Sequence, residues 1–265
     1  MKKKISNVIP IWQFDHLSKD SSILHYTSGR EGGLSSGTFE SLNISLSVSD
    51  DPENVIENRK RLAAELEMSP DKFIFPEQTH SDHIKVIQSP EEVREEIKDT
   101  DGLITNQKDI CISVLTADCV PILFYDPVRR VIGAAHAGWR GTVSMLARKM
   151  IETFKSEFNS RPSDILVGIG PSIGPDTYEV GEEVIIGIKS SFGSESNLVL
   201  NEKDNNKAYL NLWKANRILL EHMRVPPENI EKALLCTYTD DEFFFSARRL
   251  GKDCGRFGTG IMLKS

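Results

Sequence analysis

Two histidines and one cysteine are the side chains of this sequence best suited to chemistry. His80 lies in PEQTH, Cys119 in TADCVPILFYDP and His136 in AAHAGWRGT, and each motif borders an apolar run of strand length. Strands that meet in one sheet could bring these three side chains together. One thiol and two imidazoles suit a zinc-type metal ion, or a cysteine nucleophile with a histidine base. Their separations along the chain match no local zinc motif, so the grouping is a prediction about the fold.

Three protein ligands leave a fourth tetrahedral position open for water or substrate, which is typical of catalytic zinc. We therefore expect His80, Cys119 and His136 to be both metal ligands and catalytic residues. One zinc ion is the expected cofactor, and copper is the other candidate for the same ligands. His83, shortly after His80, fits an ordinary polar turn.

The segment around Cys119 interrupts an apolar run with a carboxylate. A lone cysteine in such a run is most often inert core, but an aspartate is seldom buried without a partner. In a regular strand Asp118 and Cys119 would point to opposite faces. Pro121 removes a ladder donor and predicts a bend that could turn both side chains toward one site. We expect Asp118 to protonate or orient a substrate there.

The segment over residues 131–142 predicts a strand that leads through a glycine-rich turn into a helix. We expect the helix to start after Gly141, with Thr142 as its cap. The N–H groups at a helix start, with Arg140 beside them, could bind phosphate or another anion. Glycines that only permit the turn would leave the crowding of a histidine, a tryptophan and an arginine there unexplained.

A second candidate phosphate ligand is Arg30, in the Gly/Ser-rich loop over residues 29–37. As a surface charge it could equally be a solvated loop residue. Arg248 and Ser246, near the end of the chain, are weaker candidates for contact with a substrate.

Composition restricts the class of protein. The 265 residues are 39% hydrophobic and 27% charged, which is ordinary for a soluble globular protein. The net charge of −7 and the scattered basic residues argue against a nucleic-acid partner. No apolar run reaches the ~18 residues of a membrane span, and the start MKKKISNVIPIW is too interrupted for a signal peptide. The four cysteines form no C-x-x-C pair, so we expect a cytoplasmic protein without a membrane partner.

Strands and helices are mixed along the whole chain and would position these motifs. Apolar runs predict strands at residues 9–14, 23–28, 73–78, 83–88, 101–106, 110–126, 131–138 and 164–170. Apolar periodicity predicts helices at residues 52–68, capped by Asp51, and at 142–158, 182–192 and 210–223. The tail predicts short strands at 233–239 and 242–248 before a glycine-rich end. This pattern, without repeats or a linker, predicts one α/β domain over residues 1–265.

The same motifs carry a family resemblance. QTHSDHI, TADCVPILFYDP and GAAHAGWRGT, with HYTSGREGGLSSGTFESLNIS before them and FFFSARR after, resemble the signature segments of the YfiH/YlmD family. These proteins have been called laccase-domain or polyphenol oxidoreductase proteins. The resemblance spans nearly the whole chain. It implies a single-domain layered α/β/β/α sandwich with mixed sheets, similar to the catalytic fold of deamidating toxins, and a zinc site made by His80, Cys119 and His136.

The activity implied by the resemblance is purine nucleoside phosphorolysis. Adenosine, inosine and S-methyl-5′-thioadenosine would react with phosphate to give a ribose 1-phosphate and free base, with zinc-dependent adenosine deamination beside it. The partners would be a purine nucleoside and phosphate, and the oligomeric state stays open, a monomer included. The usual deaminase signature, H-x-E with P-C-x-x-C, is absent, so deamination would be convergent.

Other functions remain compatible with the residues, among them a non-catalytic metal-binding or interaction protein that would use the same three ligands without turnover. A copper-dependent polyphenol oxidase of the laccase type needs a further copper cluster, which six histidines without a His-x-His pair supply poorly. A metal-free cysteine hydrolase or deamidase would use Cys119 as nucleophile and His136 as base, but it gives His80 no clear role.

Overall fold

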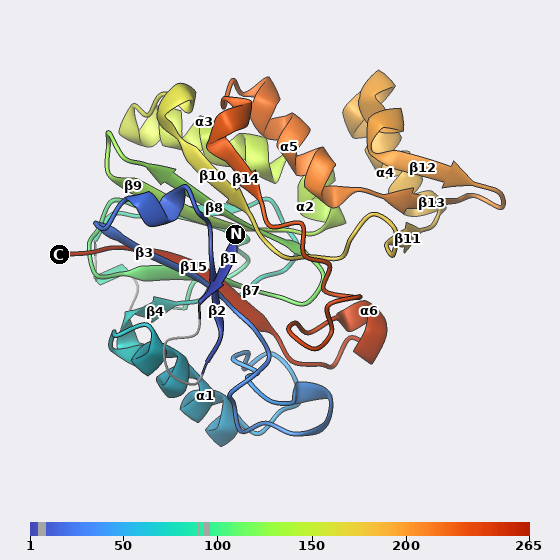
Figure 1. Cartoon of the computed structure of the whole chain (residues 1–265). Coiled ribbons are helices and arrows are strands. Elements are labelled where there is room, and N and C mark those ends of the chain that lie inside the picture. Colours follow the sequence, from blue (N-terminus) through green and yellow to red (C-terminus); the bar gives the residue numbers. More distant parts are fainter. Residues whose placement is uncertain (5–8, 90, 93–95) are drawn as a thin grey trace.

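Two large sheets, packed against one another, form the centre of the molecule (Figure 1). The computed structural model describes residues 1–4, 9–89, 91, 92 and 96–265. The first sheet has the order β1 (Lys2–Lys4), β2 (Ile11–Gln13), β3 (Ile23–Ser28), β15 (Phe257–Leu263), β7 (Cys111–Thr116), β4 (Phe73–Ile74). The second has the order β14 (Ile230–Lys232), β10 (Leu166–Ile169), β8 (Val120–Asp126), β9 (Val131–Ala137), β6 (Gly102–Thr105), β5 (Ile84–Ile87). Both sheets mix parallel and antiparallel pairs.

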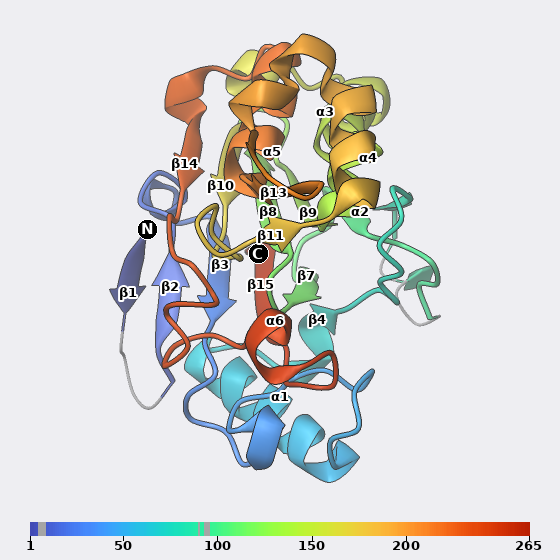
Figure 2. The same cartoon turned by 90° about the vertical axis from the view of Figure 1, so that its right-hand side faces the viewer.

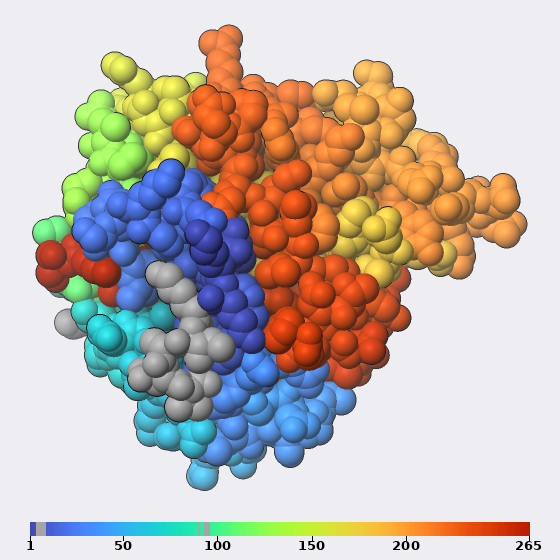
Figure 3. Space-filling view, in the orientation of Figure 1, coloured from blue at the N-terminus to red at the C-terminus, as the bar shows by residue number. Residues whose placement is uncertain are grey.

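Helices cover the outer faces of the two sheets. Those described are α1 (Pro52–Glu65), α2 (Trp139–Val143), α3 (Leu146–Phe158), α4 (Glu182–Phe192), α5 (Leu212–His222) and α6 (Ala247–Leu250). Figures 1 and 2 show α3 and α5 on one side of the molecule and α1 on the opposite side. A small sheet of β11 (Glu179–Val180), β13 (Lys207–Leu210) and β12 (Leu200–Lys203) carries a hairpin that extends away from the rest (Figures 1 and 3).

Alternating residues on the strands supply separate apolar layers. Leu123 and Tyr125 of β8 pack in the cluster between the sheets, with Ile112 of β7. Their neighbours Ile122 and Phe124 face the cluster that α3 and α5 cover. A third cluster lies between the first sheet and α1. The mixed α/β fold predicted from the sequence is confirmed, and no helix in the described residues is long and apolar enough to cross a membrane.

The helix predicted at residue 52 begins as expected. The Asp51 side chain accepts a hydrogen bond from the Glu53 N–H, and Pro52 is the first helical residue. The helix predicted over 142–158 is confirmed from Leu146 to Phe158, but its predicted start is wrong, because a separate helix, α2, meets α3 at Met145, which has a left-handed backbone with φ of 64°. Residue 138, not Thr142, caps α2.

The chain tail differs most from the prediction. Residues 233–239 and 242–248 form turns and the start of α6 rather than two strands, while the glycine-rich end forms β15, between β3 and β7. A Cβ atom on Gly260 would lie 2.7 Å from the Tyr26 ring and still closer to Ser113. Glycine therefore permits close packing in a strand whose partners lie far away in the sequence.

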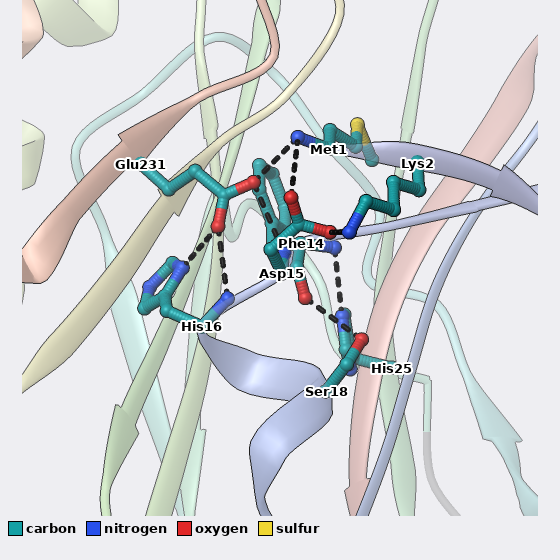
Figure 4. A network of polar contacts seen from close by, with 8 residues as sticks. All are labelled: Met1, Lys2, Phe14, Asp15, His16, Ser18, His25 and Glu231. Atoms are coloured by element: carbon teal, nitrogen blue, oxygen red, sulfur yellow. Dashed lines mark hydrogen bonds and ion pairs between the residues drawn. The ribbon is translucent and has the colours of Figure 1, made fainter.

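One carboxylate links the edges of the two large sheets, as Figure 4 shows. Glu231 of β14 lies 2.6 Å from the Met1 amine and 2.5 Å from Nδ1 of His16, and it also accepts hydrogen bonds from the backbone N–H groups of Asp15 and His16. Met1 directly precedes β1, and Asp15 and His16 follow β2. The contact thus joins segments that no strand pairing connects in the described residues.

Candidate active site

Strand direction explains why distant motifs meet at one place. In the second sheet β5 and β8 run parallel to β6, and β9 runs antiparallel to β6 and β8. Consequently β5, β6 and β8 begin, and β9 ends, at the same edge. Cys119 directly precedes β8, His136 is near the end of β9, and His80 lies in the connection that leads into β5.

The structure brings the three predicted residues together at this edge. The candidate ligand atoms of His80, Cys119 and His136 all lie within 4.8 Å of one another. The two imidazole rings are 4.9 Å apart at an angle of 74°. His136 is buried, Cys119 is half-buried and His80 is exposed, so the group opens to solvent on the His80 side. A mononuclear metal site with an accessible position fits this arrangement.

A residue that the sequence analysis missed, Asp101, holds two members of the group. It directly precedes β6, its backbone carbonyl accepts a hydrogen bond from the His136 N–H at 2.8 Å, and its Oδ1 is 2.7 Å from Nδ1 of His136. Burial would raise the pKa of Asp101, but His136 and Ser81 outweigh it and lower the pKa. An ionised carboxylate only accepts, so Nδ1 of His136 carries the proton and Nε2 is left for a metal.

The other oxygen of Asp101 fixes the turn that carries His80. It accepts hydrogen bonds from the N–H and hydroxyl of Ser81, at 2.7 and 2.9 Å, and from the Thr79 N–H at 3.2 Å. His80 itself has a left-handed backbone with φ of 63°. The only feature of the sequence that indicates a role for Asp101 is its position directly before a buried strand. Its contact with His136 follows from the pairing of strands in the fold.

Cys119 and His136 polarise one another. Burial would raise the pKa of the Cys119 thiol, but the charges and hydrogen bonds of His136 and His80 outweigh it and lower the pKa to about 6. Burial would lower the pKa of His136, but the Cys119 thiolate and Asp101 raise it to about 9. Without a metal ion these two residues therefore form a thiolate–imidazolium pair at neutral pH. The thiolate is the form that binds metals and attacks electrophiles.

Gly138 provides the space for this pair. A Cβ atom on Gly138 would lie 2.8 Å from the Cys119 sulfur and 3.3 Å from Cδ2 of His80. The backbone of Gly138, with φ of −69°, is open to any residue. A side chain is therefore excluded by contact with the ligands and not by backbone strain.

Asp118 lies at the predicted bend, with φ of 92°, where the chain crosses from β7 in the first sheet to β8 in the second. Both of its carboxylate oxygens accept hydrogen bonds at 2.6 Å, one from the Thr237 hydroxyl and one from the backbone N–H of Arg248. These contacts favour an orienting role for Asp118 over proton donation.

Two of the predicted phosphate ligands, Arg140 and Gly141, lie in α2, one exposed and one buried. Arg140 is exposed, stacks on the Trp139 ring at 4.3 Å and lies 3.4 Å from Glu183. Gly141 is buried within α2, so the helix start that we predicted after Gly141 is wrong. The helix starts earlier because Gly138 caps α2. The carbonyl of Gly138 accepts a hydrogen bond from the N–H of Thr142 at 2.9 Å.

Arg30 holds two loops together. Its guanidinium donates to the backbone carbonyls of Glu40, at 2.8 Å, and Asp241, at 3.0 Å. It borders a hollow of about 320 Å³ whose other charged residues are the acids Glu31, Glu40, Asp241 and Glu242. Acidic walls repel phosphate, so the structure favours a structural role for Arg30.

Tyr178, which the sequence analysis missed, completes the surroundings. Burial raises the pKa of the Tyr178 phenol, and the Cys119 thiolate and Asp118 raise it further, while the cations Arg248 and Arg140 oppose them. The Arg248 guanidinium lies 5.2 Å from the centre of the Tyr178 ring. Arg248 is thus a stronger candidate than its place in the sequence indicated. The sequence gives no motif that marks Tyr178, because the segments that carry Tyr178, Cys119 and Arg248 come together only in the fold.

Comparisons with known proteins agree with the motifs. Residues 24–264 match the family model described as multi-copper polyphenol oxidoreductase laccase. A purine nucleoside phosphorylase of Bacteroides thetaiotaomicron is 35% identical, covering 94% of this chain and 95% of that protein. Adenosine deaminase RL5, from an unknown prokaryotic organism, is 35% identical, covering 85% and 88%. The crystal structure of the hypothetical protein YfiH of Bacillus licheniformis is 33% identical with a TM-score of 0.91, covering 98% and 97%.

Proposed function

This chain belongs to the YfiH/YlmD family, and on that premise we propose that it is a purine nucleoside phosphorylase. The proposed substrates are adenosine, inosine and S-methyl-5′-thioadenosine, each with phosphate. The observation that carries the proposal is the grouping of His80, Cys119 and His136 beside Tyr178, in a chain whose near full-length relatives are named purine nucleoside phosphorylases.

Phosphorolysis joins a phosphate oxygen to C1′ of the ribose while the bond from C1′ to the purine nitrogen breaks. The electron pair of that bond leaves with the purine, which takes up a proton. Arg140 and Arg248 lie within electrostatic reach of Tyr178 and are suited to neutralise phosphate. Tyr178, whose pKa is raised, keeps its proton and can donate a hydrogen bond to the purine. Asp118 fixes the loops that carry these groups.

We assign His80, Cys119 and His136 as ligands of one metal ion, with zinc expected and copper as the alternative. Their donor set of one sulfur and two imidazole nitrogens suits zinc, and Asp101 turns His136 so that Nε2 is available. A zinc ion bound there would supply a Lewis acid next to the substrate. The described residues offer one such group, which suits a mononuclear site better than the multi-copper description of the family model.

Adenosine deamination is proposed as an accompanying activity of the same site. Water would replace the six-amino group of adenosine, and ammonia would leave. The support is the relative named as an adenosine deaminase together with the open, histidine-lined position of the site.

A metal-free cysteine hydrolase or deamidase is the second candidate, and one observation favours it. The lowered pKa of Cys119 and the raised pKa of His136 describe a nucleophile already paired with its acid–base partner. Activity that survives complete removal of metal would support this alternative. A phosphorylase that needs its metal would lose turnover on chelation.

The phosphorylase is tested with purified, zinc-loaded protein. We expect release of the ribose 1-phosphate and free base from the three nucleosides only when phosphate is present, and ammonia from adenosine in either case. Cys119→Ala should lower turnover by about 10³-fold or more and remove the bound zinc. Cys111→Ala is the matched control, because Cys111 is buried in the first sheet. Full activity of Cys119→Ala with its zinc retained would refute the site.

We further propose that residues 1–265 act as one catalytic domain in the cytoplasm, with a layered fold similar to that of deamidating toxins. The support for one domain is that the site draws on residues from position 80 to position 248, across both large sheets. The four free cysteines, Cys111, Cys119, Cys236 and Cys254, suit a reducing compartment.

A further inference from the structure

A hollow of about 310 Å³ lies between α5 and the end of β14, and it contains no member of the metal group. Its helical wall is a stripe of α5 at spacings of three and four residues, which includes Lys214, Arg217 and Glu221. Lys232 and Leu234 form the opposite wall. Figure 3 shows both segments, in orange and red-orange, at the surface of the molecule. The volume is sufficient for a small organic molecule.

The charge of this hollow is unusual for the molecule. Three cations line it, Lys214, Arg217 and Lys232, against one carboxylate, Glu221, which already pairs with Arg217 at 2.6 Å. The hollow therefore carries about two uncompensated positive charges at neutral pH, in a chain of net charge −7. Burial lowers the pKa of Lys232, and the neighbouring cations Arg217 and Lys214 lower it further while Glu221 opposes them, as expected where like charges repel one another. A dianion would relieve this repulsion.

Apart from Asn211, the remaining walls are apolar. Trp213 and Ile218 contribute from α5, both nearly buried, and Leu234 stands at the rim with 59% of its surface exposed. An exposed leucine beside a basic cluster offers apolar surface whose burial against a ligand would be favourable. A ligand that fills this hollow thus needs an anionic end and an apolar or aromatic body.

We propose that this hollow binds a small phosphate monoester with an apolar or aromatic body, at a site separate from the metal group. Lys214 and Lys232 contact the phosphate, because Arg217 is held by Glu221. Trp213, Ile218 and Leu234 pack against the body. The second hollow, beside Arg30, is lined by four acids and offers no such site.

The probe is 1-naphthyl phosphate, which is neither a purine nor a nucleoside, titrated calorimetrically into zinc-loaded protein. We expect one molecule bound per chain, with affinity falling as salt rises. Lys214→Gln with Lys232→Gln should weaken binding at least about tenfold, because two charge-assisted contacts are lost. Leu234→Ser should weaken 1-naphthyl phosphate but leave inorganic phosphate binding unchanged.

Two controls separate this site from the active site and from general charge. Lys108→Gln with Lys155→Gln removes the same charge from exposed positions elsewhere and should leave binding intact. Cys119→Ala should also leave it intact, so the result does not depend on the proposed function. The inference is overturned if the Lys214 and Lys232 variant binds as the parent does, or if both lysine pairs weaken binding equally. Equal affinity for inorganic phosphate and 1-naphthyl phosphate would also overturn it.

Discussion

At the scale of single residues, Asp101 has the largest influence on the candidate metal group. One of its oxygens fixes the ring of His136, and the other fixes the turn before His80 through Ser81. Neither partner is its neighbour in the sequence. The carboxylate therefore converts two separate segments into one prearranged site.

We predict that Asp101→Asn lowers zinc affinity by about 10–100-fold, because asparagine cannot accept from both sides as the carboxylate does. Competition with a fluorescent chelator measures this. The control is Asp126→Asn, which changes another fully buried aspartate at the far end of β8. Zinc affinity that falls as much in Asp126→Asn would show a general effect of stability.

Gly138 allows a comparison with its neighbour Gly141. We predict that Gly138→Ala removes most zinc binding and phosphorylase activity, because the new methyl group would lie 2.8 Å from the Cys119 sulfur. Gly141→Ala meets only ordinary contacts of 3.5 Å inside α2 and should stabilise the helix by up to about 1 kcal/mol. Metal content and melting temperature of both variants test this. Equal metal content in the two would contradict the steric argument.

At the scale of elements, the contact between Glu231 and the segment that follows β2 holds the sheet edges together. Burial would raise the pKa of Glu231, but hydrogen bonds from His16 and the Met1 amine outweigh it and hold the pKa well below its usual value of 4.5. A lowered pKa means that the ionised group stabilises the fold above about pH 4.5. This contribution is lost as the pH falls through the lower pKa of the folded state.

We predict that Glu231→Gln lowers the free energy of unfolding by about 2–4 kcal/mol at pH 7. The difference from the parent should shrink as the pH falls below about 4.5, because Glu231 is then protonated in the unfolded parent, and it should vanish only at the still lower pH where the folded parent is protonated too. Urea unfolding at several pH values measures it. Glu228→Gln, at an exposed position shortly before β14, should show no such dependence. A difference that stays constant or grows toward acid pH would disprove the prediction.

Elements with a strong local pattern were predictable from the sequence. The cap and first turn of α1 follow from Asp51 and Pro52, and α4 is found where its apolar periodicity placed it. Strand β15 was not predictable, since a central strand that contains two glycines depends on partners far away in the sequence, and no residue type at Met145 signals its left-handed backbone. The grouping of His80, Cys119 and His136 was predictable because the motifs that carry these residues are unusual. Asp101 and Tyr178 were missed because strand pairing and loop packing bring them to the site.

At the scale of the whole molecule, the candidate metal group of His80, Cys119 and His136 joins two connections and the end of one strand. His80 lies between β4 and β5, Cys119 lies between β7 and β8, and His136 lies near the end of β9. The two connections pass from the first sheet to the second. An ion bound by all three residues would therefore stabilise the packing of the two sheets as well as the site.

We predict that removal of zinc destabilises the folded protein. A ligand present at 100 to 1,000 times its dissociation constant contributes about 3–4 kcal/mol, which for a chain of this size is a fall of roughly 5–15 °C in melting temperature. Calorimetry with and without a chelator measures it. Cys119→Ala should melt at one temperature in both conditions, because it has no bound metal to lose. If the parent protein binds zinc but its melting temperature does not change after chelation, the site is already rigid without the ion. That result would contradict the proposed coupling between metal binding and the packing of the two sheets.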